Sequence, residues 1–276
     1  MITQAGLTEY RGECFIREAS CLYVPPHPLL LPYITHYTIS FPAPAVMPDD
    51  YTILPSASAT LTMAFDGNRI AGGLRGVNTT ACTVGAFANK MRLLLLIEFR
   101  PGGLYPFIPV DQRELLDASF NLEALDAGLE RVLENTIEGS DSVQGLIESL
   151  DGILLRRLSR SAPDGRVASV IRSIRLRHGE VSMRALSDEA FYSPRQLLRL
   201  FSQHVGASPK AFARVVRVNH ALRLLQERPG NDSEVAAQAG YYDQPHFIRE
   251  FQVVCGVTPS EYRRKMSVFY NEKFKL

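Results

Sequence analysis

The first hundred or so residues alternate short apolar runs, such as LTMAF and LLLLIEF, with turn-forming residues. Breaks fall at Asp66–Asn68 (DGN) and at Pro101–Gly103 (PGG). Alternation at this spacing is typical of antiparallel strands joined by tight turns. Glycine supplies the positive φ that such turns need, so the PGG stretch requires no bound phosphate to explain it. The pattern predicts a β-rich N-terminal region, either a small barrel or a sandwich.

From Asp111 to Arg160 the pattern changes, because Leu, Ile and Val now recur every three or four residues. This period is that of amphipathic helices. Their apolar stripes could pack on the β-rich region or against a second copy of the chain, and the sequence leaves both open. The breaker-rich stretch SAPDG, Ser161–Gly165, follows and predicts a linker. We therefore expect two domains, residues 1–160, with the helical segment 111–160, and residues 166–268.

After the linker every segment has helical periodicity. Seven helices are expected, at 166–177, 182–191, 193–205, 209–226, 233–239, 243–254 and 259 to about 266. The fold class predicted for the whole chain is α+β with two domains, the second of them all-α.

Two segments of this helical region repeat each other. Corresponding positions of the two segments lie fifty residues apart and carry the same or a similar residue, as in Leu197/Phe247, Arg199/Arg249, Phe201/Phe251, Gly206/Gly256 and Pro209/Pro259. Each segment begins with a helix-capping residue and a proline, Ser193 with Pro194 and Asp243 with Pro245. A short helix and a tight turn precede each cap. The repeat therefore predicts two helix-turn-helix units.

The second helix of each unit has one apolar face and one polar face. The polar faces carry Arg195, Gln196 and Arg199 in the first unit and Gln244, His246 and Arg249 in the second. Arg and Gln side chains make paired hydrogen bonds to guanine and adenine edges in the major groove. The alternative is that these are ordinary solvated helix faces. The duplication of the unit, with the same chemistry on both outer faces, favours DNA binding.

A single helix, capped at Ser208 and Pro209 and ending at Arg228–Gly230, joins the two units. About 20 residues at roughly 1.5 Å each span on the order of 30 Å. Major-groove faces of B-DNA recur about every 34 Å. The helix therefore has the length needed to place both reading helices in successive grooves on one side of the duplex.

Charge divides the chain at the same linker. Residues 1–160 hold 12 Lys+Arg against 18 Asp+Glu, a net charge of −6, and residues 161–276 hold 18 against 11, a net charge of +7. A basic C-terminal half is typical of a protein that binds a polyanion. The densest apolar run, Met91–Phe99, is too short to cross a membrane, and the N-terminus does not resemble a secretory signal, so we expect a cytoplasmic protein.

Motifs for catalysis, metals and nucleotides are absent from the sequence. The four cysteines (Cys14, Cys21, Cys82 and Cys255) have no metal-ligand spacing, so we expect neither a metal nor a cofactor. AGGLRG, Ala71–Gly76, lacks the G-x-G-x-x-G order and is expected to be a turn or bulge. His27 and His36 are expected to be structural, although a cation would be possible if Glu98 converged on them. A rival reading is a DNA-directed enzyme with a nucleophilic thiol, for which Cys14, near Arg17, is the candidate.

The stretch AGYYDQPHFIREFQVVCGVTPSEYRR, Ala239–Arg264, resembles the signature of the AraC/XylS family of bacterial transcription regulators. The resemblance covers about the last hundred residues. It implies that Arg195 and Arg199 of the first reading helix face DNA, together with Gln244, Pro245 and Arg249 of the second. Leu198 stands where family members often carry a polar reader, and Phe191 stands where the first unit usually has a small turn residue.

Family members typically carry a sensing or dimerising domain, often a cupin-like β-barrel followed by helices, in front of this module. The strand-then-helix order of residues 1–160 is similar to that plan. The resemblance implies a sequence-specific, non-enzymatic regulator that binds double-stranded DNA and responds to a small molecule. A second copy of the chain and, for an activator, RNA polymerase are further expected partners. An N-terminal half that only dimerises is the alternative, and the effector, the operator and activation versus repression stay open.

Overall fold

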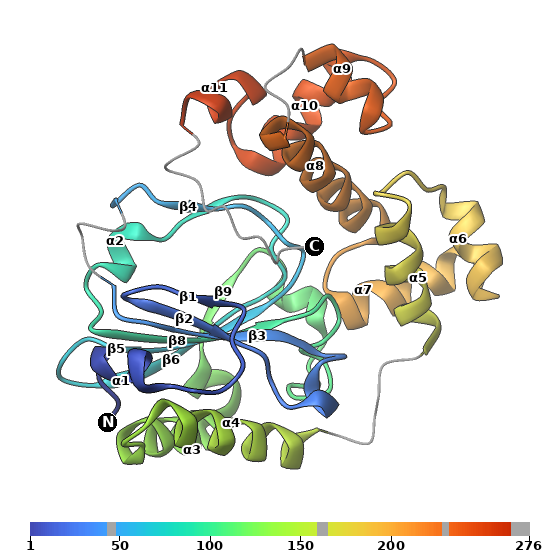
Figure 1. The fold of residues 1–276 in the computed structure, drawn as a ribbon. Coiled ribbons are helices and arrows are strands. Elements are labelled where there is room, and N and C mark those ends of the chain that lie inside the picture. The colour runs from blue at the N-terminus through green and yellow to red at the C-terminus, as the bar shows by residue number, and fades with distance from the viewer. Residues whose placement is uncertain (43–47, 159–164, 228–231, 266–276) are drawn as a thin grey trace.

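A seven-stranded antiparallel sheet organises the N-terminal half of the chain in a computed structural model, which describes residues 1–42, 48–158, 165–227 and 232–265. Figure 1 shows this sheet to one side of a separate group of helices. The strand order is β1 (Ile16–Arg17), β2 (Cys21–Val24), β3 (Ile34–Ser40), β8 (Leu93–Phe99), β5 (Thr60–Phe65), β6 (Ile70–Arg75) and β9 (Ser119–Asn121). A separate ribbon pairs β4 (Thr52–Ile53) with β7 (Cys82–Thr83). The β-rich N-terminal region is therefore confirmed.

Both predicted turns are present. Asp66 Oδ1 accepts hydrogen bonds from the backbone amides of Asn68 and Arg69, and Gly67 has a φ of 109°, which closes the β5–β6 hairpin. Gly102 has a φ of 74° and follows β8. Both glycines occupy the region of positive φ that other residues avoid.

The prediction of a turn or bulge at AGGLRG was wrong, because its first five residues, 71–75, lie in strand β6 and pair with β5 in unbroken register. The glycines are needed for close packing. A Cβ atom on Gly72 would lie 2.8 Å from Cβ of Leu122, and the Gly72 amide donates a 2.7 Å hydrogen bond to Glu130. Helix α3 (Leu122–Gly139) therefore sits directly on this strand.

Helix α3 and helix α4 (Val143–Arg157) lie below the sheet in Figure 1. Their buried Leu133 and Leu150 share one hydrophobic core with Leu61 and Leu95 of the strands. Of the two packing alternatives left open by the sequence, the apolar stripes pack on the sheet. The expectation that helix begins at Asp111 was wrong. That stretch forms the 3-10 helix η2 (Gln112–Leu115) and then strand β9, which pairs with β6.

Short elements complete the N-terminal half, namely α1 (Gln4–Glu9), η1 (Pro28–Leu30) and α2 (Gly85–Ala88). The C-terminal half is helical. Its helices are α5 (Gly165–Leu176), α6 (Met183–Ala190), α7 (Pro194–Val205), α8 (Pro209–Glu227), α9 (Asp232–Gln238), α10 (Gln244–Cys255) and α11 (Pro259–Arg264). Each described boundary lies within two residues of the expected helix ranges, and the expected end of the last helix, at about 266, lies outside the described residues. Most of the expected linker Ser161–Gly165, the expected end of α8 at 228–230 and the expected domain end at 268 lie outside the described residues.

Helix α8 contributes to two separate hydrophobic cores. Phe212 and Val215, near its start, belong to the core of the first unit, whereas Leu222 and Leu225, near its end, belong to the core of the second. With 19 residues it is roughly 28 Å long. Figure 1 accordingly shows α7 at one end of this helix and α10 at the other.

Candidate nucleic-acid interface

The first unit consists of α6, a tight turn and α7. Helix α7 is capped by Ser193, whose hydroxyl accepts a hydrogen bond from the Gln196 amide, with Pro194 at its first position. Leu197, Phe201 and Val205 are completely buried on one face. This one-sided burial, set by the helical period, leaves the opposite face of α7 to solvent.

The exposed face of α7 carries Arg195, Gln196, Leu198 and Arg199. Leu198 is 46% exposed, so an apolar side chain lies between the two arginines on this face. Both arginines are exposed, so their guanidinium groups can reach a partner. The predicted outward placement of this face is therefore observed.

Gln196 has a second role in the fold. Its Oε1 accepts hydrogen bonds from the amide of Ser193 at 3.1 Å and from the hydroxyl of Ser193 at 2.9 Å, which completes a capping box. Paired hydrogen bonding to adenine needs both the oxygen and the nitrogen of the amide. Because the oxygen is already engaged, Gln196 offers a partner only its NH2 group.

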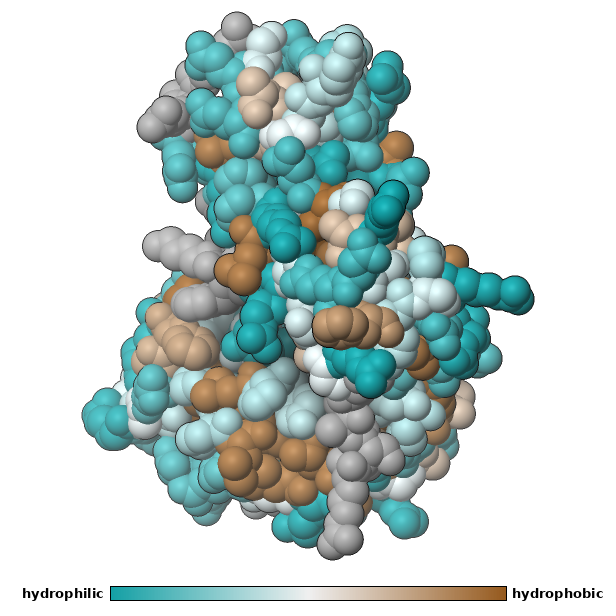
Figure 2. All heavy atoms as spheres, turned by 90° about the vertical axis from the view of Figure 1, so that its right-hand side faces the viewer, coloured by the Kyte–Doolittle hydropathy of each residue, from teal (hydrophilic) through white to brown (hydrophobic). Residues whose placement is uncertain are grey.

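The second unit repeats this design in α9, a turn and α10. Asp243 caps α10 by accepting a 2.7 Å hydrogen bond from the His246 amide, and Phe247 and Phe251 are completely buried. Pro245 and Arg249 are exposed. Seen from the side in Figure 2, the lobe that contains α9, α10 and α11 has a mostly hydrophilic surface.

Gln244 and His246 are half-buried and hold contacts within the chain. The hydroxyl of Ser233, on α9, donates a 2.8 Å hydrogen bond to Gln244 Oε1. His246 Nε2 lies 3.7 Å from Glu250 Oε1, which is also 3.4 Å from Arg214 Nε on α8. These contacts fix α10 against its neighbours, so the two residues present less to a partner than the sequence pattern predicted.

The turns of the two units are closed by different residues in the same conformation. Gly240 has a φ of 73° in the second unit, and Phe191 has a φ of 54° in the first. Phe191 is also 88% exposed, so no burial compensates for its left-handed backbone. Phe191, which replaces the small residue usual at this turn, therefore lies at a strained position beside the reading helix.

The N-terminal half contacts both units, which sequence reasoning missed. The side-chain amide of Asn219, on α8, donates a 2.8 Å hydrogen bond to the carbonyl oxygen of Pro55. Leu54 belongs to the core of the second unit, and Ala57 and Val77 belong to the core of the first. The available sequence signal for this contact was Asn219 itself, a polar residue within an apolar stretch of the helix. The two helix-turn-helix units are thus packed onto the N-terminal domain.

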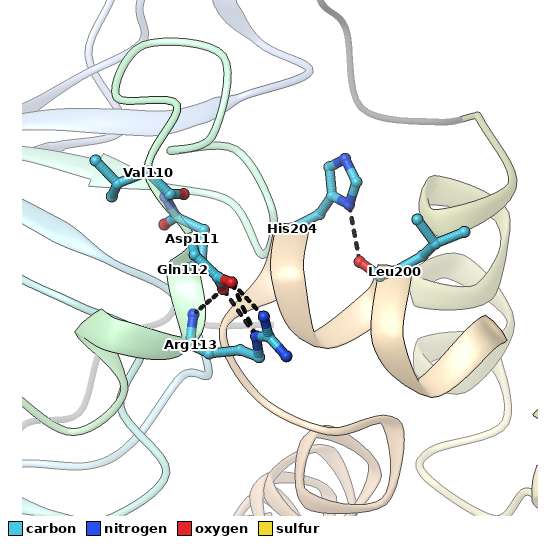
Figure 3. Close-up of polar contacts among 6 residues, drawn as sticks. All are labelled: Val110, Asp111, Gln112, Arg113, Leu200 and His204. Atoms are coloured by element: carbon cyan, nitrogen blue, oxygen red, sulfur yellow. Dashed lines mark hydrogen bonds and ion pairs between the residues drawn. The ribbon is translucent and has the colours of Figure 1, made fainter. Parts of the chain in front are cut away.

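The end of α7 rests against η2. A Cβ atom on Gly206 would lie 2.9 Å from the carbonyl oxygen of Gln112, so only glycine permits this approach. The ring centroids of Tyr105 and His204 are 4.4 Å apart. Figure 3 shows η2 beside the end of α7, with Asp111 paired to Arg113 and His204 bonded to the Leu200 carbonyl. The Arg113 guanidinium lowers the pKa of Asp111. The N-terminal domain therefore supports the first reading helix from its C-terminal end.

The structure also shows the surroundings of the thiols and histidines that were considered as candidate reactive or metal-binding groups. Burial raises the pKa of Cys21 to about 11 and also raises that of Cys255, which keeps both thiols protonated. The Arg17 guanidinium lies 3.7 Å from Cys14 Sγ, but it also donates to backbone carbonyls.

His36 and Glu98 face each other across β3 and β8. Within the described ranges no three His, Cys, Asp or Glu residues form a metal-binding group. No described helix is long and apolar enough to span a membrane.

Known proteins contain units similar to these two. Residues 186–265 match a helix-turn-helix domain model. The chain is 32% identical over 83 residues to an uncharacterised HTH-type transcriptional regulator of Haemophilus influenzae, covering 30% of this chain and 28% of that protein. It is 37% identical over 81 residues to the HTH-type transcriptional regulator GlxA of Rhizobium meliloti, covering 29% of this chain and 25% of that protein. The matches thus span about a quarter of the length of these relatives.

Among solved structures, a probable AraC family transcriptional regulator from Rhodopseudomonas palustris is 28% identical over 37% of this chain and 97% of that chain, with a TM-score of 0.34. The range matched by the domain model, 186–265, contains α7 and α10 and ends just after α11. The domain at residues 186–265 is therefore a helix-turn-helix domain of the AraC type, as the resemblance in the sequence indicated.

Proposed function

We propose that the protein is a sequence-specific transcription regulator that binds double-stranded DNA through α7 and α10. The observation that carries the proposal is the repeated exposed arginine, Arg199 on one reading helix and Arg249 on the other, at equivalent positions of two capped helices with buried opposite faces. Exposed cations at one register on two joined units fit a polyanion with a regular repeat. Residues 166–268 form the DNA-binding domain in this proposal.

Within each reading helix, the proposal assigns different roles to different side chains. Arg195, Arg199 and Arg249 contact base edges or phosphates, and Pro245 lies at the start of α10, where the helix meets the groove. Leu198 is apolar and exposed, so it suits the methyl group of thymine rather than a polar base edge. Gln196, Gln244 and His246 act mainly by holding these helices in place.

Residues 1–160 are the effector-binding or dimerising domain in the proposal, with a cupin-like architecture as its finer description. The support is the packing of Leu54, Ala57 and Val77 into the cores of the DNA-binding units, because a change in this domain would then reach both reading helices. A second copy of the chain and, for an activator, RNA polymerase are the further partners. A domain that only dimerises would show no stabilisation by any compound in a metabolite thermal-shift screen.

The test is selection of bound fragments from random DNA by the full chain, followed by fluorescence anisotropy on the selected sequence over a range of salt concentrations. We expect one enriched motif of nearly two helical turns and an affinity that falls steeply with salt, because phosphate contacts release counterions. The absence of any enriched motif, or binding without a salt slope, would contradict the proposal.

A further inference from the structure

A hollow of about 450 Å³ lies between α5, α8 and the N-terminal loops that hold Pro32 and Pro101. Its lining contains four arginines and one histidine, namely Arg100, Arg172, Arg175, Arg223 and His178. Among the described residues that line it, none is an Asp or Glu. It lies away from the reading faces of α7 and α10, at the boundary between the two domains.

The arrangement of the arginines follows from the helices that carry them. Arg172 and Arg175 are three residues apart on α5 and therefore project from the same side of that helix. Arg100 comes from the end of the sheet, where its Nε donates a hydrogen bond to the Leu31 carbonyl. That bond directs one edge of the guanidinium towards the backbone, which leaves its other N–H groups for a ligand. Two domains thus bring cations to one cavity.

Arg175 is the most telling of these side chains. It is partly buried, and burial lowers its pKa, as do the nearby charges of Arg100 and Arg223. Gathering like charges in a partly desolvated place is unfavourable without a counter-charge. Among the described residues, Arg175 takes part in no observed ion pair. A bound anion would supply the missing charge.

Apolar and aromatic groups complete the hollow. Ile171 of α5 and Val216 of α8 line it between the cations. At its edge the ring of His178 stacks on that of His220, with centroids 4.0 Å apart and an interplanar angle of 11°. Ligand sites combine apolar walls with a few convergent polar groups, and this hollow has both.

We propose that this hollow is an anion-binding site for a small organic molecule that carries two or more phosphate or carboxylate groups. Four arginines from two domains supply more positive charge than one anionic group neutralises, and Arg is the side chain best suited to paired contacts with either oxyanion. The site gives the effector of the proposed function a chemical class. A bound anion would contact Arg100 of the N-terminal domain together with Arg172 and Arg175 of the DNA-binding domain, and so link the two domains.

The test is isothermal titration calorimetry of the full chain, without DNA, using pyrophosphate and citrate as probes at low ionic strength. We compare the wild type with Arg172→Gln, Arg175→Gln and Arg100→Gln. The matched control is Arg131→Gln, which removes an exposed cation of α3 outside the hollow. We expect each hollow variant to weaken binding of at least one probe by about tenfold, with the control unchanged. Preference for pyrophosphate or for citrate distinguishes a phosphate from a carboxylate ligand.

Equal weakening in all four variants would show non-specific attraction and overturn the proposal, as would no binding by the wild type. A salt-dependent loss of DNA affinity in Arg172→Gln without any probe binding would assign the hollow to the DNA backbone instead. Thermal denaturation of each variant excludes misfolding, and the exposed Arg172 provides a variant in which the fold is little disturbed. Because probe binding is measured without DNA, its outcome is independent of whether the chain binds an operator.

Discussion

The backbone amide of Ala81 donates a 2.9 Å hydrogen bond to the carbonyl oxygen of Val254, in the last turn of the second reading helix. Carbonyl groups in the last turn of a helix have no partner within that helix. The N-terminal domain therefore completes the end of α10, just as it meets the end of α7 through η2. The two reading helices are positioned by α8 and also by a domain that lies outside both units.

Loss of the Asn219 side chain tests this support. Its amide bonds to the Pro55 carbonyl, so Asn219→Ala leaves that carbonyl without its donor. We expect the free energy of unfolding to fall by about 1–2 kcal/mol in urea denaturation of the full chain. Gln252→Ala, at an exposed position of α10, is the control and is expected to change it by less than about 0.5 kcal/mol. Equal effects of the two substitutions would show that the bond contributes nothing.

Two glycines offer a matched pair at the ends of the reading helices. Gly206 and Gly256 both have positive φ, 91° and 73°, but a Cβ atom on Gly206 would lie 2.9 Å from the Gln112 carbonyl, whereas one on Gly256 would have no neighbour within 4 Å. We expect Gly256→Ala to cost about 1 kcal/mol through backbone strain alone, and Gly206→Ala to cost about 2–3 kcal/mol. Urea denaturation measures both. A Gly206→Ala cost no larger than that of Gly256→Ala would mean that η2 moves away freely.

The left-handed turn residues predict opposite effects of substitution. Phe191 has a φ of 54° and is 88% exposed, so Phe191→Gly relieves strain and loses little burial. We expect it to leave thermal stability unchanged or to raise it by up to about 1 kcal/mol, because the greater freedom of glycine in the unfolded chain offsets part of the gain. Gly240→Ala, at the corresponding turn, is expected to lower stability by about 1 kcal/mol. Calorimetry measures both variants. A melting temperature of Phe191→Gly several degrees below that of the wild type would show that the Phe191 ring makes a stabilising contact.

Acid stability depends in part on His220. Burial lowers its pKa below the usual 6.5, and the neighbouring His178 and Arg223 lower it further. As pH falls below about 6.5, the unfolded chain takes up a proton that the folded chain resists, so stability falls until pH passes the folded pKa. Above 6.5 this contribution is constant. We expect urea denaturation from pH 7.5 to 5 to show a smaller loss for His220→Gln than for the wild type, and an identical slope would exclude His220 as a cause.

Base reading is tested by Arg249→Ala. If Arg249 contacts a base edge, the substitution costs about 1–3 kcal/mol on the selected DNA and relaxes preference at one position. Uniform weakening on every sequence would assign it to a phosphate. Arg131→Ala, which removes an exposed cation of α3 in the N-terminal domain, is the control and is expected to leave anisotropy-measured affinity unchanged. Equal weakening by Arg131→Ala would indicate general charge attraction.

Local signals in the sequence determined the helices of the C-terminal half. The caps Ser193 and Asp243 each bond within three residues, and the periodic apolar positions such as Phe201 and Phe251 are completely buried. Caps and helical periods act between residues close in the chain, so a sequence pattern contains them. The exposed positions of Arg195, Arg199 and Arg249 follow from the same periods.

Contacts between residues distant in the chain were decided only by the tertiary structure. Gly72 pairs with Met63 of β5 and lies against Leu122 of α3, and Gln244 is held by Ser233 across the turn. The approach of Ala81 to Val254, and of Arg100 to the arginines of α5, joins residues that lie more than seventy positions apart. The sequence by itself determined which helix faces carry arginine. Packing of the two domains decided which side chains remain available on them and where cations from both domains meet, because such packing depends on the shape of the whole fold rather than on any local pattern.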